Sequence, residues 1–72
     1  MTELLLSLGQ FITYKRETLG YKKMQFCKMM DVGDDSLRSW ERDRFVPTGK
    51  NMKNIVTLLK FTNKERIHYF GH

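Results

Sequence analysis

Apolar residues recur at intervals of three and four along most of the chain, and this spacing limits the possible folds more than any other feature. Met52, Ile55, Val56 and Leu59 follow the i, i+3, i+4, i+7 pattern, which places four side chains on one face of an α-helix. No stretch alternates apolar and polar residues with the period of two that is typical of a half-buried strand. The sequence therefore predicts an all-α fold.

Capping residues and glycines divide the apolar runs into five short helices. Thr2 can cap a first helix and Gly20 can end it. Thr62-Asn63-Lys64-Glu65 has the capping-box pattern that opens a last helix, which Gly71 would end. The predicted helices span about residues 3–18, 23–30 and 34–41, a segment around 52–59, and the segment from Thr62 to Gly71, with a loop at 43–50 that contains Pro47.

The length of 72 residues suits one small domain over residues 1–72, because a chain this short has a modest core and no room for a cofactor-binding domain. Its single cysteine, Cys27, cannot form an internal disulfide, which favours a reducing compartment. The leucines at 4–6 follow Glu3 rather than a basic segment, so we expect neither a signal peptide nor a membrane span. The expected location is the cytoplasm.

Charge is distributed unevenly along the chain. Lys and Arg outnumber Asp and Glu by 13 to 8, and the resulting net charge of +5 lies in residues 37–72, since residues 1–36 carry five charges of each sign. Such asymmetry favours a polyanionic partner, with nucleic acid ahead of an acidic membrane surface. The alternative is a basic surface that only keeps the protein soluble.

The predicted helices 23–30 and 34–41 are separated by a short turn, the arrangement of a helix-turn-helix unit. Cys27 falls where the two helices would cross and only a small side chain fits. Asp31 falls at the turn, where a left-handed backbone is needed and Asp tolerates it better than most residues. The inward positions of the unit are Phe26, Cys27, Met30, Val32, Leu37 and Trp40.

From about Leu8 to Leu59 the chain resembles, without a gap, the Cro and phage-repressor (Xre-type) helix-turn-helix domains. The resemblance rests on Leu8-Gly9, Ile12, Arg16, Gly20-Tyr21, Trp40-Glu41-Arg42, Pro47, Ile55-Val56 and Leu58-Leu59, together with the helix-turn-helix unit. It implies a compact, lambda-repressor-like five-helix domain whose helix-turn-helix spans about residues 23–42, with 34–41 as the recognition helix. It also implies a structural ion pair between Arg16 and Glu41.

The resemblance further implies which side chains would meet double-stranded DNA. The expected base-facing residues are Asp34, Asp35, Ser36 and Ser39, and the expected phosphate contacts are Lys22, Lys23, Arg38, Arg42 and Arg44. If about five phosphates are neutralised, the logarithm of the affinity falls against the logarithm of salt with a slope of about −4 to −5. The alternative for the basic set is a solvated rim.

Two acids at the start of the recognition helix depart from the family pattern. Asp34 and Asp35 are favoured there by the helix dipole, and Asp34 can pair with Arg38 one turn later. Alternatively, one carboxylate accepts a hydrogen bond from a cytosine N4 amino group, or the helix faces a partner other than DNA. Asp43 stands where the family often has glycine, and we interpret it as a structural left-handed residue.

Catalytic and metal sites are not indicated. His68 and His72 are four residues apart, but Gly71 lies between them and Cys27 is not placed to be a third ligand. Cys27 is expected to be buried, and a buried thiol is inert. We therefore expect no enzyme activity, no cofactor and no metal.

The resulting functional prediction is a sequence-specific, double-stranded DNA-binding transcriptional regulator, most simply a Cro-like or phage-type repressor. A weak homodimer is expected through the C-terminal Ile67, Tyr69 and Phe70, of which part must close the core. The alternatives are a protein-interaction module on the same scaffold, of antirepressor or antitoxin-like type, and an excisionase-like architectural factor.

Overall fold

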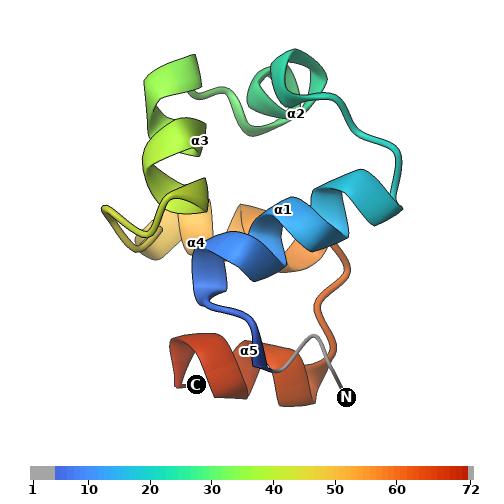
Figure 1. The fold of residues 1–72 in the computed structure, drawn as a ribbon, viewed down its shortest axis with the longest axis vertical. Coiled ribbons are helices and arrows are strands. Elements are labelled where there is room, and N and C mark those ends of the chain that lie inside the picture. The colour runs from blue at the N-terminus through green and yellow to red at the C-terminus, as the bar shows by residue number, and fades with distance from the viewer. Residues whose placement is uncertain (1–4, 72) are drawn as a thin grey trace.

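The computed structural model describes residues 5–71, which form five helices and no strand. The helices are α1 (Leu8–Thr18), α2 (Lys23–Met30), α3 (Asp34–Glu41), α4 (Gly49–Leu58) and α5 (Asn63–Phe70). Figure 1 shows α2 and α3 together at one end, α1 crossing the middle in front of α4, and α5 at the opposite end. No helix in the described part of the chain is long and apolar enough to cross a membrane. The all-α, five-helix prediction is confirmed.

The first helix, α1, begins at Leu8, later than the expected start near residue 3. Ser7 caps it: the Ser7 hydroxyl accepts a hydrogen bond from the Gln10 backbone N–H at 3.1 Å, and the Gln10 side-chain oxygen accepts one from the Ser7 N–H at 2.9 Å. This reciprocal capping box satisfies two backbone donors and fixes the start of the helix. Thr2, the expected cap, lies outside the described residues.

Helices α1 to α4 and the connection after α4 contribute buried apolar side chains, whereas α5 has no buried residue. These side chains form one core cluster. It consists of Phe11, Ile12, Phe26, Cys27, Met30, Leu37, Trp40, Ile55, Leu59 and Phe61. The half-buried Tyr69 of α5 packs against this cluster, and its ring stacks on that of Phe11 at a centroid distance of 4.7 Å. The Tyr69 hydroxyl donates a hydrogen bond to the Leu6 carbonyl at 2.9 Å. The aromatic residues of α5 therefore seal the core.

The N-terminal end of α1 packs directly on the backbone at the C-terminal end of α3. A Cβ atom on Gly9 would lie 2.5 Å from the Glu41 carbonyl oxygen and 2.6 Å from that of Trp40, closer than atoms can approach. Asp43 then joins the two helices, since its carboxylate accepts hydrogen bonds from the Ser7 hydroxyl at 2.6 Å and the Gly9 N–H at 2.8 Å. Asp43 has the expected left-handed φ of 60° and also anchors α1.

Candidate nucleic-acid interface

The turn between α2 and α3 holds the two helices in a helix-turn-helix arrangement. Asp31 has a φ of 57° and a ψ of 48°, so the prediction of a left-handed residue there is confirmed. The N–H of Asp31 donates to the Lys28 carbonyl at 3.2 Å, and that of Val32 to the Cys27 carbonyl at 3.1 Å. These two bonds use the free carbonyls at the end of α2 and set the direction of α3.

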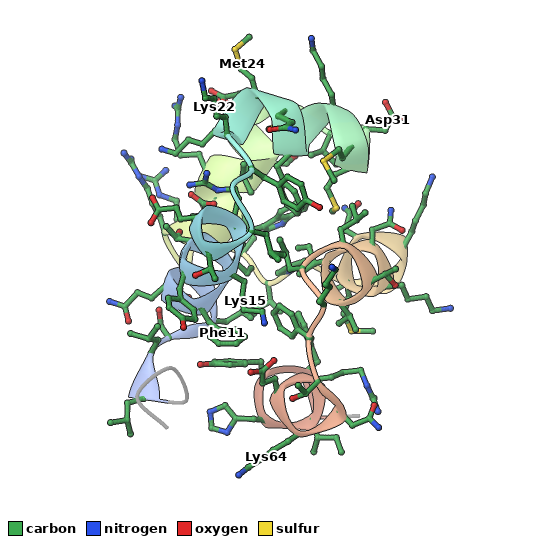
Figure 2. The ribbon with its side chains drawn as sticks, turned by 90° about the vertical axis from the view of Figure 1, so that its right-hand side faces the viewer. Phe11, Lys15, Lys22, Met24, Asp31 and Lys64 are labelled. Atoms are coloured by element: carbon green, nitrogen blue, oxygen red, sulfur yellow. The ribbon has the colours of Figure 1, made fainter. Side chains whose placement is uncertain are left out.

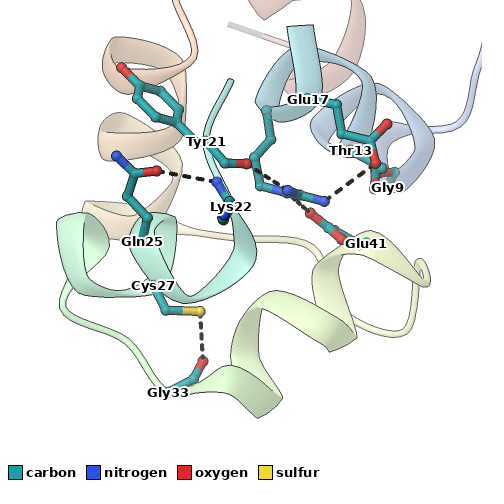
Figure 3. A network of polar contacts seen from close by, with 10 residues as sticks. Gly9, Thr13, Glu17, Tyr21, Lys22, Gln25, Cys27, Gly33 and Glu41 are labelled. Atoms are coloured by element: carbon teal, nitrogen blue, oxygen red, sulfur yellow. Dashed lines mark hydrogen bonds and ion pairs between the residues drawn. The ribbon is translucent and has the colours of Figure 1, made fainter. Parts of the chain in front are cut away.

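Cys27 lies in the interior of this unit. The residue is 7% exposed, and its sulfur lies 3.9 Å from the Gly33 carbonyl oxygen. A dashed line marks this contact in Figure 3. Burial raises the pKa of the Cys27 thiol, with further increases from the carboxylates of Asp34 and Glu41. The thiol therefore stays protonated at neutral pH, and Cys27 acts as a small packing residue.

A buried ion pair joins α1 to α3 (Figure 3). Arg16 Nε donates a hydrogen bond to Glu41 Oε2 at 2.8 Å, and the two side chains are only 5% and 9% exposed. Arg16 Nη1 also donates to the Tyr21 carbonyl at 2.7 Å, and Nη2 lies 3.8 Å from a Glu17 carboxylate oxygen. The structure thus brings together the two residues that the family resemblance implied, and it satisfies the charge of Glu41 inside the protein.

The four residues of α3 that were expected to face bases differ in their exposure. Leu37 and Trp40 point into the core and define the inner side of the helix. Of the four residues, the two acids are exposed and the two serines are half-buried: Asp34, Asp35, Ser36 and Ser39. The acidic pair is therefore the more accessible part of this set.

Arg38 lies with the two acids on α3 and forms ion pairs with both. Its Nη2 is 2.9 Å from Asp34 Oδ2, one helical turn earlier, and its Nη1 is 3.8 Å from Asp35 Oδ1. Gly33, the N-cap residue, provides no side-chain cap, so the acids contribute through the helix dipole and through Arg38. The Arg38 side chain is 55% exposed, and pairs this exposed contribute less than about 1 kcal/mol to stability.

Four basic side chains lie at the start of α2 and just after α3. Lys22 and Lys23 lie at the N-terminal end of α2, and Arg42 and Arg44 follow the end of α3. All four are exposed, and none forms an ion pair with another residue of the segment 5–71. Figure 2 places Lys22 at one end of the molecule and Lys64 of α5 at the other. Arg38, the fifth expected phosphate contact, lies on α3 as predicted and pairs there with the two acids.

The three C-terminal residues expected to form a dimer contact differ in their exposure. Ile67 is 55% exposed, whereas Tyr69 and Phe70 are half-buried and pack on the core. The two aromatic rings also line an apolar pocket. Its other lining residues are Val46, Pro47, Thr48, Gly49 and Met52.

The histidine positions do not gather with other metal-binding side chains. Among residues 5–71, no group of three or more His, Cys, Asp or Glu side chains is close enough to hold a metal ion. The His68 ring instead meets the Tyr69 ring edge-on at a centroid distance of 4.6 Å. His72 lies outside the described residues.

The chain is similar to a helix-turn-helix transcriptional regulator. It is 31% identical over 55 residues to the HTH-type transcriptional regulator DicA of Escherichia coli (strain K12). The match covers 76% of this chain and 41% of DicA, so the chain spans about two-fifths of the length of that relative. No protein-family model matches the chain, and no solved structure matches it. This similarity supports a relationship between this chain and the helix-turn-helix regulators.

Proposed function

We propose that the chain is a sequence-specific, double-stranded DNA-binding transcriptional regulator that inserts α3 into the major groove. The observation that carries this proposal is the position of the basic side chains. Lys22 and Lys23 at the start of α2, and Arg42 and Arg44 just after α3, are exposed and are free of ion pairs within residues 5–71. Exposed cationic side chains that no carboxylate neutralises are suited to contact phosphates while a recognition helix lies in the major groove.

The similarity to a regulator of the helix-turn-helix type supports the same proposal. By analogy with Cro and phage repressors, we propose that the protein represses by occupying an operator. We further propose that two copies bind adjacent half-sites and meet through Ile67 and the pocket lined by Tyr69 and Phe70. Oligonucleotides selected for binding would then contain two half-sites about one helical turn apart. A selected sequence with a single half-site would contradict the dimer.

Salt dependence of DNA affinity tests the proposal. Because Arg38 is paired on α3, four basic residues remain for phosphates, and we expect the logarithm of affinity to fall against the logarithm of salt with a slope of about −3 to −4. Lys23→Ala should weaken binding to all duplexes alike and make the slope shallower by about 1. Fluorescence anisotropy with a labelled duplex at several salt concentrations measures both quantities.

Lys64→Ala is the matched control for this experiment, because it removes the same charge from α5 at the far end of the molecule (Figure 2). It should leave the slope unchanged. A wild-type slope near zero, without preference among sequences, would overturn the proposed function. Equal effects of the lysine substitutions at residues 23 and 64 would place the DNA on another face.

A protein-interaction module on the same scaffold is the second candidate. The exposed acidic pair favours it, since the Asp35 side chain is 97% exposed at a position expected to face a polyanion. Such a module would bind a partner through α3 and would show no sequence preference for DNA. The anisotropy experiment therefore separates the two candidates.

A further inference from the structure

We propose that Arg38 binds the major-groove edge of a guanine, and that Asp34 is a positioning residue that holds the Arg38 guanidinium for this contact. The inference rests on the proposed DNA binding and names the base that α3 would recognise. It changes the expected role of Arg38, which the sequence placed among the phosphate contacts. It also gives the acids at the start of α3 a role other than direct contact with bases.

The position of Arg38 on the helix is the first reason. An α-helix turns by about 100° per residue, so Arg38 lies close above Asp34 and well away from Leu37 and Trp40, which face the core. Arg38 is the only cationic residue of α3, and Glu41, at the end of the helix, has its carboxylate held by a buried arginine of α1. Arg38 is therefore the one long side chain of α3 with free donors on the exposed face.

The geometry of the ion pair is the second reason. Arg38 Nη2 lies 2.9 Å from Asp34 Oδ2 and Nη1 lies 3.8 Å from Asp35 Oδ1, so the acids engage part of the guanidinium. Arginine has five N–H donors in a planar fork, and the remaining donors are available to the guanine O6 and N7 acceptors. A guanidinium already held by a carboxylate loses less conformational freedom when it binds a base.

Charge is the third reason. A free carboxylate at this place would be repelled by the phosphates, whereas one that is paired with Arg38 has its charge largely compensated. The Asp34 carboxylate would compete with a DNA phosphate for the Arg38 guanidinium, so the ion pair would weaken a contact between Arg38 and a phosphate. A pair of opposite charges thus weakens binding to DNA in general and favours a site where the guanine fork is available. This combination provides specificity rather than affinity.

The experiment uses the full chain and the duplex obtained by selection of bound oligonucleotides. Each guanine of the selected site is replaced in turn by 7-deazaguanine, which lacks the N7 acceptor but pairs normally with cytosine and leaves the cytosine N4 amino group intact. At one guanine in each half-site, we expect the wild-type protein to lose about 5-fold or more in affinity. Arg38→Met, which has no hydrogen-bond donor to offer the guanine, should be insensitive to the same replacement.

Asp34→Asn tests the positioning role through two measurements, the affinity for random-sequence DNA and the preference for the guanine. Replacing a residue that only stabilises the fold would not raise the first and lower the second. Asp34→Asn should raise the affinity for random-sequence DNA, because a negative charge is removed, and it should reduce the preference for the guanine. Lys23→Ala is the control, since it should weaken binding to both duplexes by the same factor. Circular dichroism of each variant confirms that the helices are retained.

The outcomes distinguish this inference from the proposed function. If selection yields a defined sequence but Arg38→Met keeps the same sensitivity to 7-deazaguanine as the wild type, the guanine contact is wrong and DNA binding stands. If 7-deazaguanine has no effect while Asp34→Asn loses the base preference, the carboxylate reads cytosine instead. If no duplex is bound with salt dependence, both the inference and the proposed function fail.

Discussion

Replacing Arg16 by Met is expected to lower the free energy of unfolding by about 3–5 kcal/mol. The substitution removes the partner of Glu41, whose side chain is 9% exposed, and leaves that carboxylate buried without a compensating charge. It also removes the donor to the Tyr21 carbonyl. A domain of 72 residues has a total stability of about 4–11 kcal/mol, so the variant would be close to unfolding at room temperature.

The double variant Arg16→Met/Glu41→Leu should be more stable than Arg16→Met alone, because it removes the stranded charge along with its partner. Urea denaturation of the two single variants and the double variant measures the coupling. Arg38→Met is the matched control: its ion pair has nearly the same length, 2.9 Å against 2.8 Å, but is exposed, and its loss should cost less than about 1 kcal/mol. Equal costs at Arg16 and Arg38 would contradict the role assigned to burial.

Gly9→Ala is expected to destabilise the protein by about 3 kcal/mol, even though alanine is normally the better helix former by up to about 1 kcal/mol. The new methyl group would fall 2.5 Å and 2.6 Å from two carbonyl oxygens of α3. Backbone atoms cannot rotate aside as a side chain can, so α1 and α3 would have to separate. That movement would also stretch the hydrogen bond from the Gly9 N–H to Asp43.

Gly33→Ala provides the comparison for this substitution. Gly33 has a negative φ of −78°, and a Cβ there would meet no atom within 4 Å. Its replacement should cost less than about 1 kcal/mol, the usual effect of alanine at a helix N-cap. Thermal denaturation of both variants tests the contact directly. A Gly9→Ala protein as stable as the wild type would show that α1 and α3 do not approach as closely as the structure has them.

The parts of the fold that sequence reasoning recovers are those fixed by neighbouring residues. The apolar spacing and the capping box at Thr62 give α5, and the turn residue Asp31 gives the junction of α2 and α3. The start of α1 was missed because the leucines before it continue an apolar run. A local signal was nevertheless present, since Ser7 and Gln10 have the spacing of a capping box.

Contacts between distant residues are much harder to predict. The Arg16–Glu41 pair was expected only from family resemblance, because nothing local connects two residues that are 25 apart. The bond between Ser7 and Asp43 spans 36 residues and had no signal at all. At the candidate site, helical spacing predicted the pairing of Asp34 with Arg38. The proposed contact of Arg38 with a base also required knowing which side of α3 faces the core.

The central claim, that α3 and its bordering basic residues form a DNA-binding face, is tested most directly by amide chemical-shift mapping. Isotope-labelled protein is titrated with the selected duplex, and the shift of each backbone N–H is followed. We expect the largest changes at the start of α2 near Lys22, along α3 and through Arg44, with little change in α5 around Lys64. The largest changes in α5 or around the pocket at Tyr69, with α3 unmoved, would contradict the claim.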